Sequence, residues 1–213
     1  MDEKNNININ MLSYSFHHID QTEVVNAKPH DLYQYNVYVG KKTIVTNEFN
    51  SYWYIENDTV KTYSGLTTTI TSNKLCVEIY GYTPEDRSSS FSKFTDLPYI
   101  NGCSSKQLIN PVRPGDPTWQ MLYIPPFTSE QAHHIHSTTR VVYVLSGKGT
   151  SHIGSSGKTT DYELTPGMVL IIDKMIPHHF STQDESLIVL PLHIFSSTSE
   201  EHDHPMFRGT YRI

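Results

Sequence analysis

Residues 165–178 read TPGMVLIIDKMIPH, and this stretch carries most of the information about the fold. Pro166 and Gly167 indicate a tight turn, and the apolar run after them predicts a short buried strand. A second turn then leads to Pro177 and His178, where another strand begins. The block therefore predicts a turn, a buried strand, a turn and a second strand, with His178 at the entry to that second strand.

A second block, His134-Ile135-His136, lies upstream of the first. Alternate residues of an extended segment share a face, so these two imidazoles can meet one ion. A lone His-x-His is weak evidence, but nine of the twelve histidines follow residue 130, which places any histidine chemistry in the second half. Other histidines of this region, which are out of phase or in a hairpin, are expected at the surface or in supporting roles: His133, His152 and His179.

Together the two blocks resemble the cupin superfamily, whose first motif is a His-x-His pair, a Glu and then a Gly, and whose second is a Pro-Gly turn followed by Pro-His. The first motif maps onto His134, His136, Arg140 and Gly147, and the resemblance covers residues 120–195. It implies a cupin-type jelly-roll β-barrel that binds one divalent metal ion through His134, His136 and His178.

Arg140 departs from the pattern, because many cupins supply a glutamate ligand at this position. Arginine stays cationic and has no lone pair to donate to a metal. The site should then consist of three neutral imidazoles, with open positions on the ion. Arg140 shares a strand face with Val142 and Val144, so it can point toward the ion. Two facing positive charges need an anion between them. Our hypothesis is a substrate carboxylate or similar oxyanion that bridges the metal and Arg140; the alternative is that Arg140 pairs with Glu130 or Asp173.

Three-histidine cupin sites resemble those of thiol dioxygenases and of certain diketone- or ring-cleaving dioxygenases, which use Fe(II). The resemblance implies an Fe(II)-dependent oxygenase that acts on a small organic acid with O₂, although the same ligands suit Zn, Ni, Mn or Cu. Arg140 and Tyr143 are the candidate catalytic residues. We expect Tyr143, Phe180, Leu190 and Leu192 to keep the site apolar. His193, which is out of phase with the two leucines, is expected to lie outside the site.

Two other functions stay open. One is metal-dependent lyase, isomerase or decarboxylase chemistry without O₂, which needs a general base such as Tyr123, Tyr143 or Glu130. The other is a non-catalytic cupin that binds a small molecule.

The rest of the chain predicts an all-β protein. In the first half, β-branched and aromatic runs predict strands, among them a hairpin of residues 66–71 and 75–82. Residues 84–118 are rich in turn signals and are interpreted as a surface connection. We therefore expect a β-rich N-terminal half at 1–110 and the metal-binding cupin with a tail at 111–213. The first half is either a degenerate second cupin or an extension that dimerises.

The composition of the chain limits the kinds of partner that we expect it to bind. The formal net charge of −6, without a cluster of Lys and Arg, argues against nucleic acid and anionic membranes. Cys76 and Cys103 are too few for a disulfide framework, and no secretory signal is apparent. We expect a cytoplasmic homodimer whose partners are small molecules. A second His-x-His, His202 to His204, is interpreted as part of a mobile tail or interface rather than as a second metal site.

Overall fold

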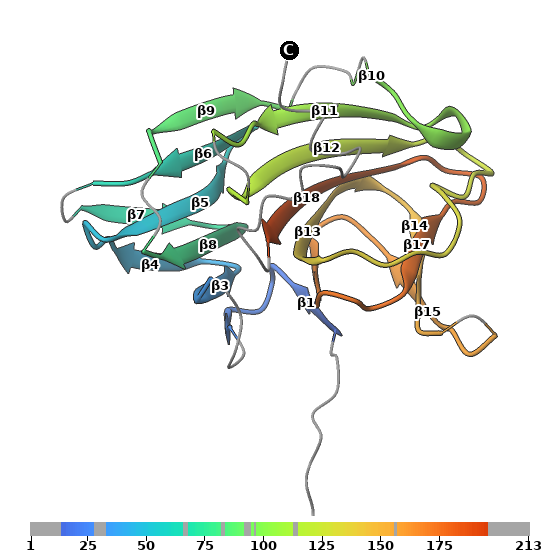
Figure 1. The fold of residues 1–213 in the computed structure, drawn as a ribbon, viewed down its shortest axis with the longest axis horizontal. Coiled ribbons are helices and arrows are strands. Elements are labelled where there is room, and N and C mark those ends of the chain that lie inside the picture. Colours follow the sequence, from blue (N-terminus) through green and yellow to red (C-terminus); the bar gives the residue numbers. More distant parts are fainter. Residues whose placement is uncertain are drawn as a thin grey trace, which may run out of the picture.

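The structure is a computed structural model, and it describes residues 14–27, 33–65, 68–81, 84–91, 95, 97–112, 115–155 and 157–195. These residues form strands, turns and one short 3₁₀ turn, η1 (Ile100–Gly102). The all-β prediction is confirmed. In Figure 1 most strands of the first half gather on the left, and most strands of the second half lie in the centre and on the right. None of the described segments is a helix of the length and apolarity that a membrane crossing requires.

The larger sheet of the second half has seven strands. In spatial order they are β1 (Tyr14–His18), β16 (Met168–Ile172), β13 (Thr138–Gly147), β18 (Leu187–Phe195), β12 (Thr118–Ile124), β11 (Ser104–Ile109) and β10 (Leu97–Pro98). All described pairings in this sheet are antiparallel. A smaller sheet has the order β15 (Thr160–Leu164), β14 (Gly149–Ile153), β17 (His178–Ser181).

These two sheets enclose an apolar core, as the cupin-type jelly roll requires. Val142 and Leu170 of the large sheet pack in one cluster with Ile153 and Phe180 of the small one. The chain passes between the sheets at the turn after β13, where Gly147 has φ +80°. A Cβ atom there would lie 1.8 Å from the Ser186 carbonyl oxygen, so only glycine fits. This is the glycine that the first motif predicts.

The first half forms a second pair of sheets. Six strands run in the order β2 (Glu23–Asn26), β3 (Tyr35–Val39), β8 (Leu75–Tyr80), β5 (Asn50–Glu56), β6 (Thr59–Tyr63) and β9 (Arg87–Ser90). Against them lies a two-stranded sheet of β4 (Lys42–Val45) and β7 (Thr69–Ser72). Ile44 and Ile70 of the small sheet pack with Tyr52 and Cys76 of the large one.

The predicted hairpin of residues 66–71 and 75–82 is wrong. β7 pairs with β4, whereas β8 pairs with β3 and β5. The turn between β7 and β8 carries the chain from one sheet to the facing sheet, because Ile70 and Cys76 fill the space between the sheets from opposite sides. A short polar turn between two β-rich runs does not distinguish a hairpin from such a corner.

Both halves share one core. A single buried cluster joins Val37, Trp53 and Val77 of the first half to Trp119 and Val141 of the second. The rings of Trp53 and Trp119 lie 6.5 Å apart, centroid to centroid. The large sheets of the two halves therefore pack against each other, and each is buried on both faces.

Segments also cross between the halves. The N-terminal strand β1 pairs with β16, so residues from the start of the chain extend the sheet of the second half. The segment 84–118 is more ordered than expected, because it contributes β9 to the first half and β10 and β11 to the second. The division at residue 110 stays a prediction. The tail with His202 and His204 lies outside the described residues.

Candidate metal centre

Backbone pairing brings the two predicted histidine blocks together. His178 is the first residue of β17, and its N–H donates to the carbonyl of His134 at 2.9 Å. The N–H of His134 donates back to the carbonyl of His178 at 3.2 Å. The carbonyl of His136 accepts from the N–H of Met175 at 2.7 Å, in the turn between β16 and β17. These bonds join the segment before β13 to the turn that precedes β17.

The ring nitrogens of His134 and His178 have defined roles. Nδ1–H of His134 donates to the carbonyl of Ala132 at 2.8 Å, and Nδ1–H of His178 donates to the carbonyl of Ile176 at 2.8 Å. A neutral imidazole that donates through Nδ1 carries its lone pair on Nε2. Both Nε2 atoms therefore carry the lone pair that a metal ligand needs, and backbone carbonyls of the kind that commonly orient such ligands hold both rings. Nε2 of His134 also contacts the amide nitrogen of Gln131 at 2.7 Å.

The three predicted ligands converge. The potential ligand atoms of His134, His136 and His178 all lie within 4.8 Å of one another. Nε2 of His134 lies 2.7 Å from Nε2 of His136, and the rings of His134 and His178 are 4.9 Å apart at their centroids. The structure thus brings together the three side chains that the sequence singles out.

The local environment fits a divalent metal ion. Nε2 of His178 is buried and has no hydrogen-bond partner among the described residues, which costs about 1–3 kcal/mol unless a ligand or ion completes it. Burial and the nearby Arg140 charge lower the pKa of His178 to about 3. Burial also lowers the pKa of His134 to about 4 and the pKa of His136 further. Three neutral imidazoles at one point are a donor set for Fe(II), Zn(II), Ni(II), Mn(II) or Cu(II).

Lowered pKa values predict how the metal-free protein responds to acid. Below pH 6.5 the unfolded chain takes up protons at His134 and His178, whereas the folded chain does not until about pH 4 and about pH 3. Stability should therefore fall as pH drops from about 6.5 to about 4. Urea denaturation of chelator-treated protein across this range measures the slope, and His178→Gln should flatten it. An unchanged slope in that variant would contradict the buried neutral state of His178.

Arg140 faces the same side as the three histidines. It lies opposite Ile172 of β16, which belongs to the core between the sheets. Burial lowers the pKa of Arg140 to about 10, so the guanidinium stays protonated at neutral pH. Its Nε is buried without a hydrogen-bond partner. Among the described residues, no ion pair joins Arg140 to Glu130, although the two charges influence each other through space.

Glu130 is the buried acid of this region, with 3% of its surface exposed. Its Oε2 accepts from the N–H of Phe180 at 3.3 Å, and its Oε1 accepts from the amide of Gln131 at 3.1 Å. Burial raises the pKa of Glu130, while Arg140 and these two donors oppose that rise. The same amide nitrogen of Gln131 lies 2.7 Å from Nε2 of His134, so Glu130 and Gln131 support the metal centre from one side.

Tyr143 does not lie with the histidines. It is on the opposite face of β13 from Arg140, in the core shared with the first half, together with Leu190 and Leu192. Tyr123 pairs with Ile188, which packs against the same core, so it too faces away from the centre. Of the side chains expected to keep the site apolar, Phe180 lies between the two sheets of the barrel.

His193 was predicted to lie outside the site, but the structure places it beside Arg140. It lies directly opposite Arg140 on β18 and is 4% exposed, with Nε2 buried and unpartnered. Burial lowers its pKa well below 6.5, and the charges of Arg140 and His178 lower it further. The leucines that His193 alternates with face the first half, so His193 faces the metal centre. Because β18 is buried on both faces, alternation along it does not show which face is the barrel interior.

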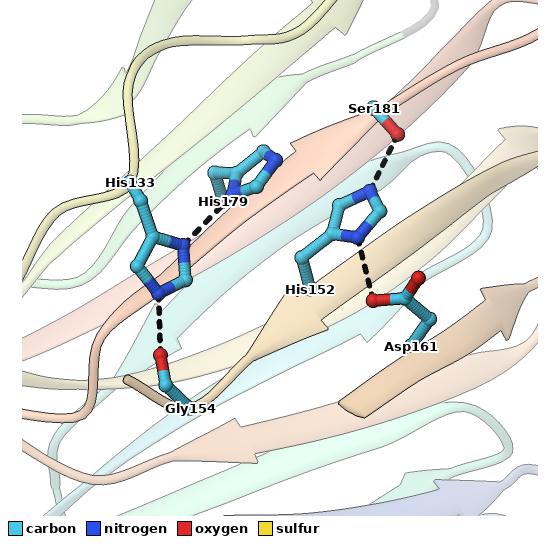
Figure 2. Close-up of polar contacts among 6 residues, drawn as sticks. All are labelled: His133, His152, Gly154, Asp161, His179 and Ser181. Atoms are coloured by element: carbon cyan, nitrogen blue, oxygen red, sulfur yellow. Dashed lines mark hydrogen bonds and ion pairs between the residues drawn. The ribbon is translucent and has the colours of Figure 1, made fainter. Parts of the chain in front are cut away.

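The remaining described histidines of the second half form a row on the outside of the barrel (Figure 2). Nδ1 of His133 lies 2.9 Å from Nδ1 of His179, and the His179 ring stacks on His152 at 4.3 Å. His152 accepts from the Ser181 hydroxyl and donates to Asp161, both at 2.7 Å. The sequence does not reveal this chain of Ser181, His152 and Asp161, because the three residues lie on three different neighbouring strands. The row ties β14, β15 and β17 together behind the metal ligands.

Comparisons with known proteins agree with the fold. The Cupin domain family matches residues 120–195. HEPD of Streptomyces albus, solved with 2-hydroxyethylphosphonate and Fe(II) bound, superposes with a TM-score of 0.61 at 7% identity over 92% of this chain and 79% of its own. Vicilin of hazelnut, Corylus avellana, gives a TM-score of 0.51 at 8% identity over 85% of each chain. Residues 120–195 therefore form a cupin domain, and the fold is a cupin jelly roll.

Two curated relatives match at the level of sequence. The chain is 34% identical over 71 residues to the acireductone dioxygenase of Bacillus cytotoxicus, which is 33% of this chain and 41% of that protein. It is 35% identical over 69 residues to the acireductone dioxygenase of Bacillus cereus, which is 32% of this chain and 40% of that protein. The chain thus matches less than half of the length of these curated relatives.

Proposed function

We propose that this protein is a metal-dependent oxygenase that binds Fe(II) through His134, His136 and His178 and acts on a small organic acid. The observation that carries the proposal is the convergence of three neutral imidazoles, two of them with backbone-oriented lone pairs. The partial similarity to acireductone dioxygenases supports oxygen chemistry. When bound, the iron would supply the capacity to activate O₂ next to a coordinated substrate.

The charges of the centre support an anionic substrate. The three imidazoles leave the double charge of the ion uncompensated, and Arg140 adds a further positive charge nearby. The buried carboxylate of Glu130 acts on Arg140 through space, forms no ion pair with it among the described residues, and already accepts two hydrogen bonds. A substrate carboxylate between the ion and Arg140 would neutralise this excess and complete the hydrogen bonding of the guanidinium.

A second candidate is non-oxidative metal-dependent chemistry, such as that of a lyase, isomerase or decarboxylase. The observation that favours it is Glu130, whose pKa burial raises toward the range of a general acid or base. Turnover under strict anaerobiosis would support this candidate over the oxygenase. Tight binding of acids without any turnover would instead support a non-catalytic cupin.

Oxygen consumption tests the leading proposal. Protein loaded with Fe(II) should take up O₂ when a panel of small organic acids is added, and protein loaded with Zn(II) should not. No uptake with any acid, at full iron occupancy, would reject the oxygenase.

Arg140→Gln should raise the Michaelis constant for the acid by about tenfold or more, because a charged hydrogen bond contributes about 1.5–3 kcal/mol. Its metal content should stay unchanged, since Arg140 is not a ligand. Lys148→Gln removes an equal charge from an exposed ion pair at the other end of β13 and should change neither value. A Michaelis constant that stays unchanged in Arg140→Gln would contradict the anion hypothesis.

We propose in addition that the first half is a degenerate cupin. The fold similarity to HEPD, which covers both halves, supports this proposal. The first half carries a buried acid on β8, Glu78, which accepts hydrogen bonds from Tyr38, Tyr52, Asn36 and Asn50. These donors leave Glu78 no free position for a metal. The cytoplasmic location and the homodimer stay predictions.

A further inference from the structure

Three unpartnered polar atoms lie on one face of the large sheet beside the metal centre. They are Oγ1 of Thr138, Nε of Arg140 and Nε2 of His193, each buried and without a hydrogen-bond partner among the described residues. Thr138 and Arg140 are two residues apart on β13, and His193 lies opposite Arg140 on β18. Alternate residues of one strand and opposite residues of neighbouring strands share a face.

Such a group is unusual, because buried polar side chains are nearly always hydrogen-bonded. Thr138 is 6% exposed and His193 is 4% exposed, so bulk water does not satisfy them. They adjoin the metal centre, since the charges of both Arg140 and His193 act on His136. One polar ligand bound at this place could form hydrogen bonds with all three atoms.

We propose that Thr138, Arg140 and His193 form a subsite that binds the carboxylate of a small acid. This inference rests on the proposed function in one respect only: the part of the acid outside the subsite is taken to bind the metal ion. The guanidinium presents parallel N–H donors to a planar carboxylate, and the threonine hydroxyl donates a further hydrogen bond. The neutral imidazole donates through one ring nitrogen without adding charge. A neutral ligand would leave the Arg140 guanidinium without a charged hydrogen-bond partner among the described residues.

The position of the subsite also indicates where in the barrel the acid binds and how long it is. Val142 follows Arg140 on the same face of β13 and belongs to the apolar core between the sheets. Polar atoms therefore occupy the end of β13 that carries Thr138, and apolar side chains occupy the rest of this face. The acid group binds in the polar layer next to the histidines, which favours a short acid whose second oxygen reaches the ion.

Oxalate binding to the Zn(II)-loaded protein tests this subsite without oxygen turnover. Oxalate offers one carboxylate to the ion and another to Arg140, whereas oxamide, its neutral analogue, should not bind measurably. Titration calorimetry should show oxalate affinity lowered by about tenfold or more in Arg140→Gln and by about threefold or more in Thr138→Val and in His193→Phe. Lys148→Gln serves as the matched charge control.

Thermal unfolding without oxalate separates binding from structure. Thr138→Val and His193→Phe replace unpartnered polar groups by apolar groups of similar shape, so each should unfold at the same or a higher temperature than the parent protein. Oxalate should raise the melting temperature of the parent protein more than that of either variant. A structural role would instead lower the melting temperature of the variants without oxalate and leave the oxalate affinity unchanged.

The outcomes distinguish this subsite from the proposed function. Oxalate binding that depends on all three residues, in a protein that takes up no O₂ with iron, would retain the subsite and reject the oxygenase. Uptake of O₂ together with oxalate affinity that is equal in the parent protein and in all three variants would retain the oxygenase and overturn the subsite.

Discussion

Replacing His178 with alanine is expected to abolish metal retention, whereas replacing its neighbour His179 is not. His178 is buried, and its Nε2 carries a lone pair directed at His134 and His136. Loss of one of three protein ligands should weaken binding by more than about a hundredfold, the upper range for removing a supporting group alone. His179 points out of the barrel toward His133 and His152, so its loss leaves the three ligands in place (Figure 2).

Metal analysis by mass spectrometry, after expression in medium replete with iron and zinc, measures this contrast. We expect about one ion per chain in the parent protein and in His179→Ala, and almost none in His178→Ala. Circular dichroism should show that both variants keep the β-sheet signal of the parent. Equal metal content in the two variants, or a metal-free parent protein, would overturn the assignment of the three ligands.

The strands of the cupin domain were predictable because their signals are local. Four strands of the second half lie between local turn signals of the sequence: Gly149–Ile153, Met168–Ile172, His178–Ser181 and Leu187–Phe195. Met168–Ile172 and Leu187–Phe195 are largely apolar runs followed by polar residues, and such runs have few alternatives in a β protein. The two histidine blocks were predictable for the same reason, because each is a short motif.

The first half was harder to predict because its pairings are not local. β1 is a short strand whose partner, β16, lies about 150 residues further along the chain. The corner between β7 and β8 depends on which sheet Ile70 and Cys76 fill, and no residue in the turn encodes that choice. Strand content was therefore readable from the sequence, whereas sheet membership was not.

The lining of the candidate site was predicted only in part, and the cause is the shared core. A sheet with one wet face shows apolar residues alternating with polar ones, which identifies its inside. β18 is buried on both faces, so Leu190 and His193 are both buried and alternation does not tell the barrel interior from the contact with the first half. For this reason the sequence placed Tyr143 in the barrel interior, although it faces the first half, and placed His193 outside the site, although it faces the metal centre.

The same shared core predicts that both halves unfold together when Trp119 is replaced with alanine. Trp119 is fully buried, packs near Trp53 of the first half, and donates its Nε1–H to the carbonyl of Leu190 at 3.3 Å. Removing a buried tryptophan costs about 3–5 kcal/mol, against a net stability of about 5–15 kcal/mol for a typical domain. The variant should therefore lose a large part of the total stability of the protein.

Urea unfolding measured by circular dichroism and by tryptophan fluorescence checks this prediction. The two signals should shift together to a lower midpoint in Trp119→Ala, because the large sheets of the two halves stabilise each other through one core. Phe127→Ala is the matched control, since this ring is 79% exposed and its loss should change stability by less than about 0.5 kcal/mol.

Folded Trp119→Ala should keep its metal. Trp119 packs in the core shared with the first half, on the same face of the sheet as Val141 and Tyr143, whereas Arg140 lies on the other face. A loss below about 1 kcal/mol, or separate transitions for the two halves, would show that the second half folds as an independent barrel and that the contact with the first half contributes little to it.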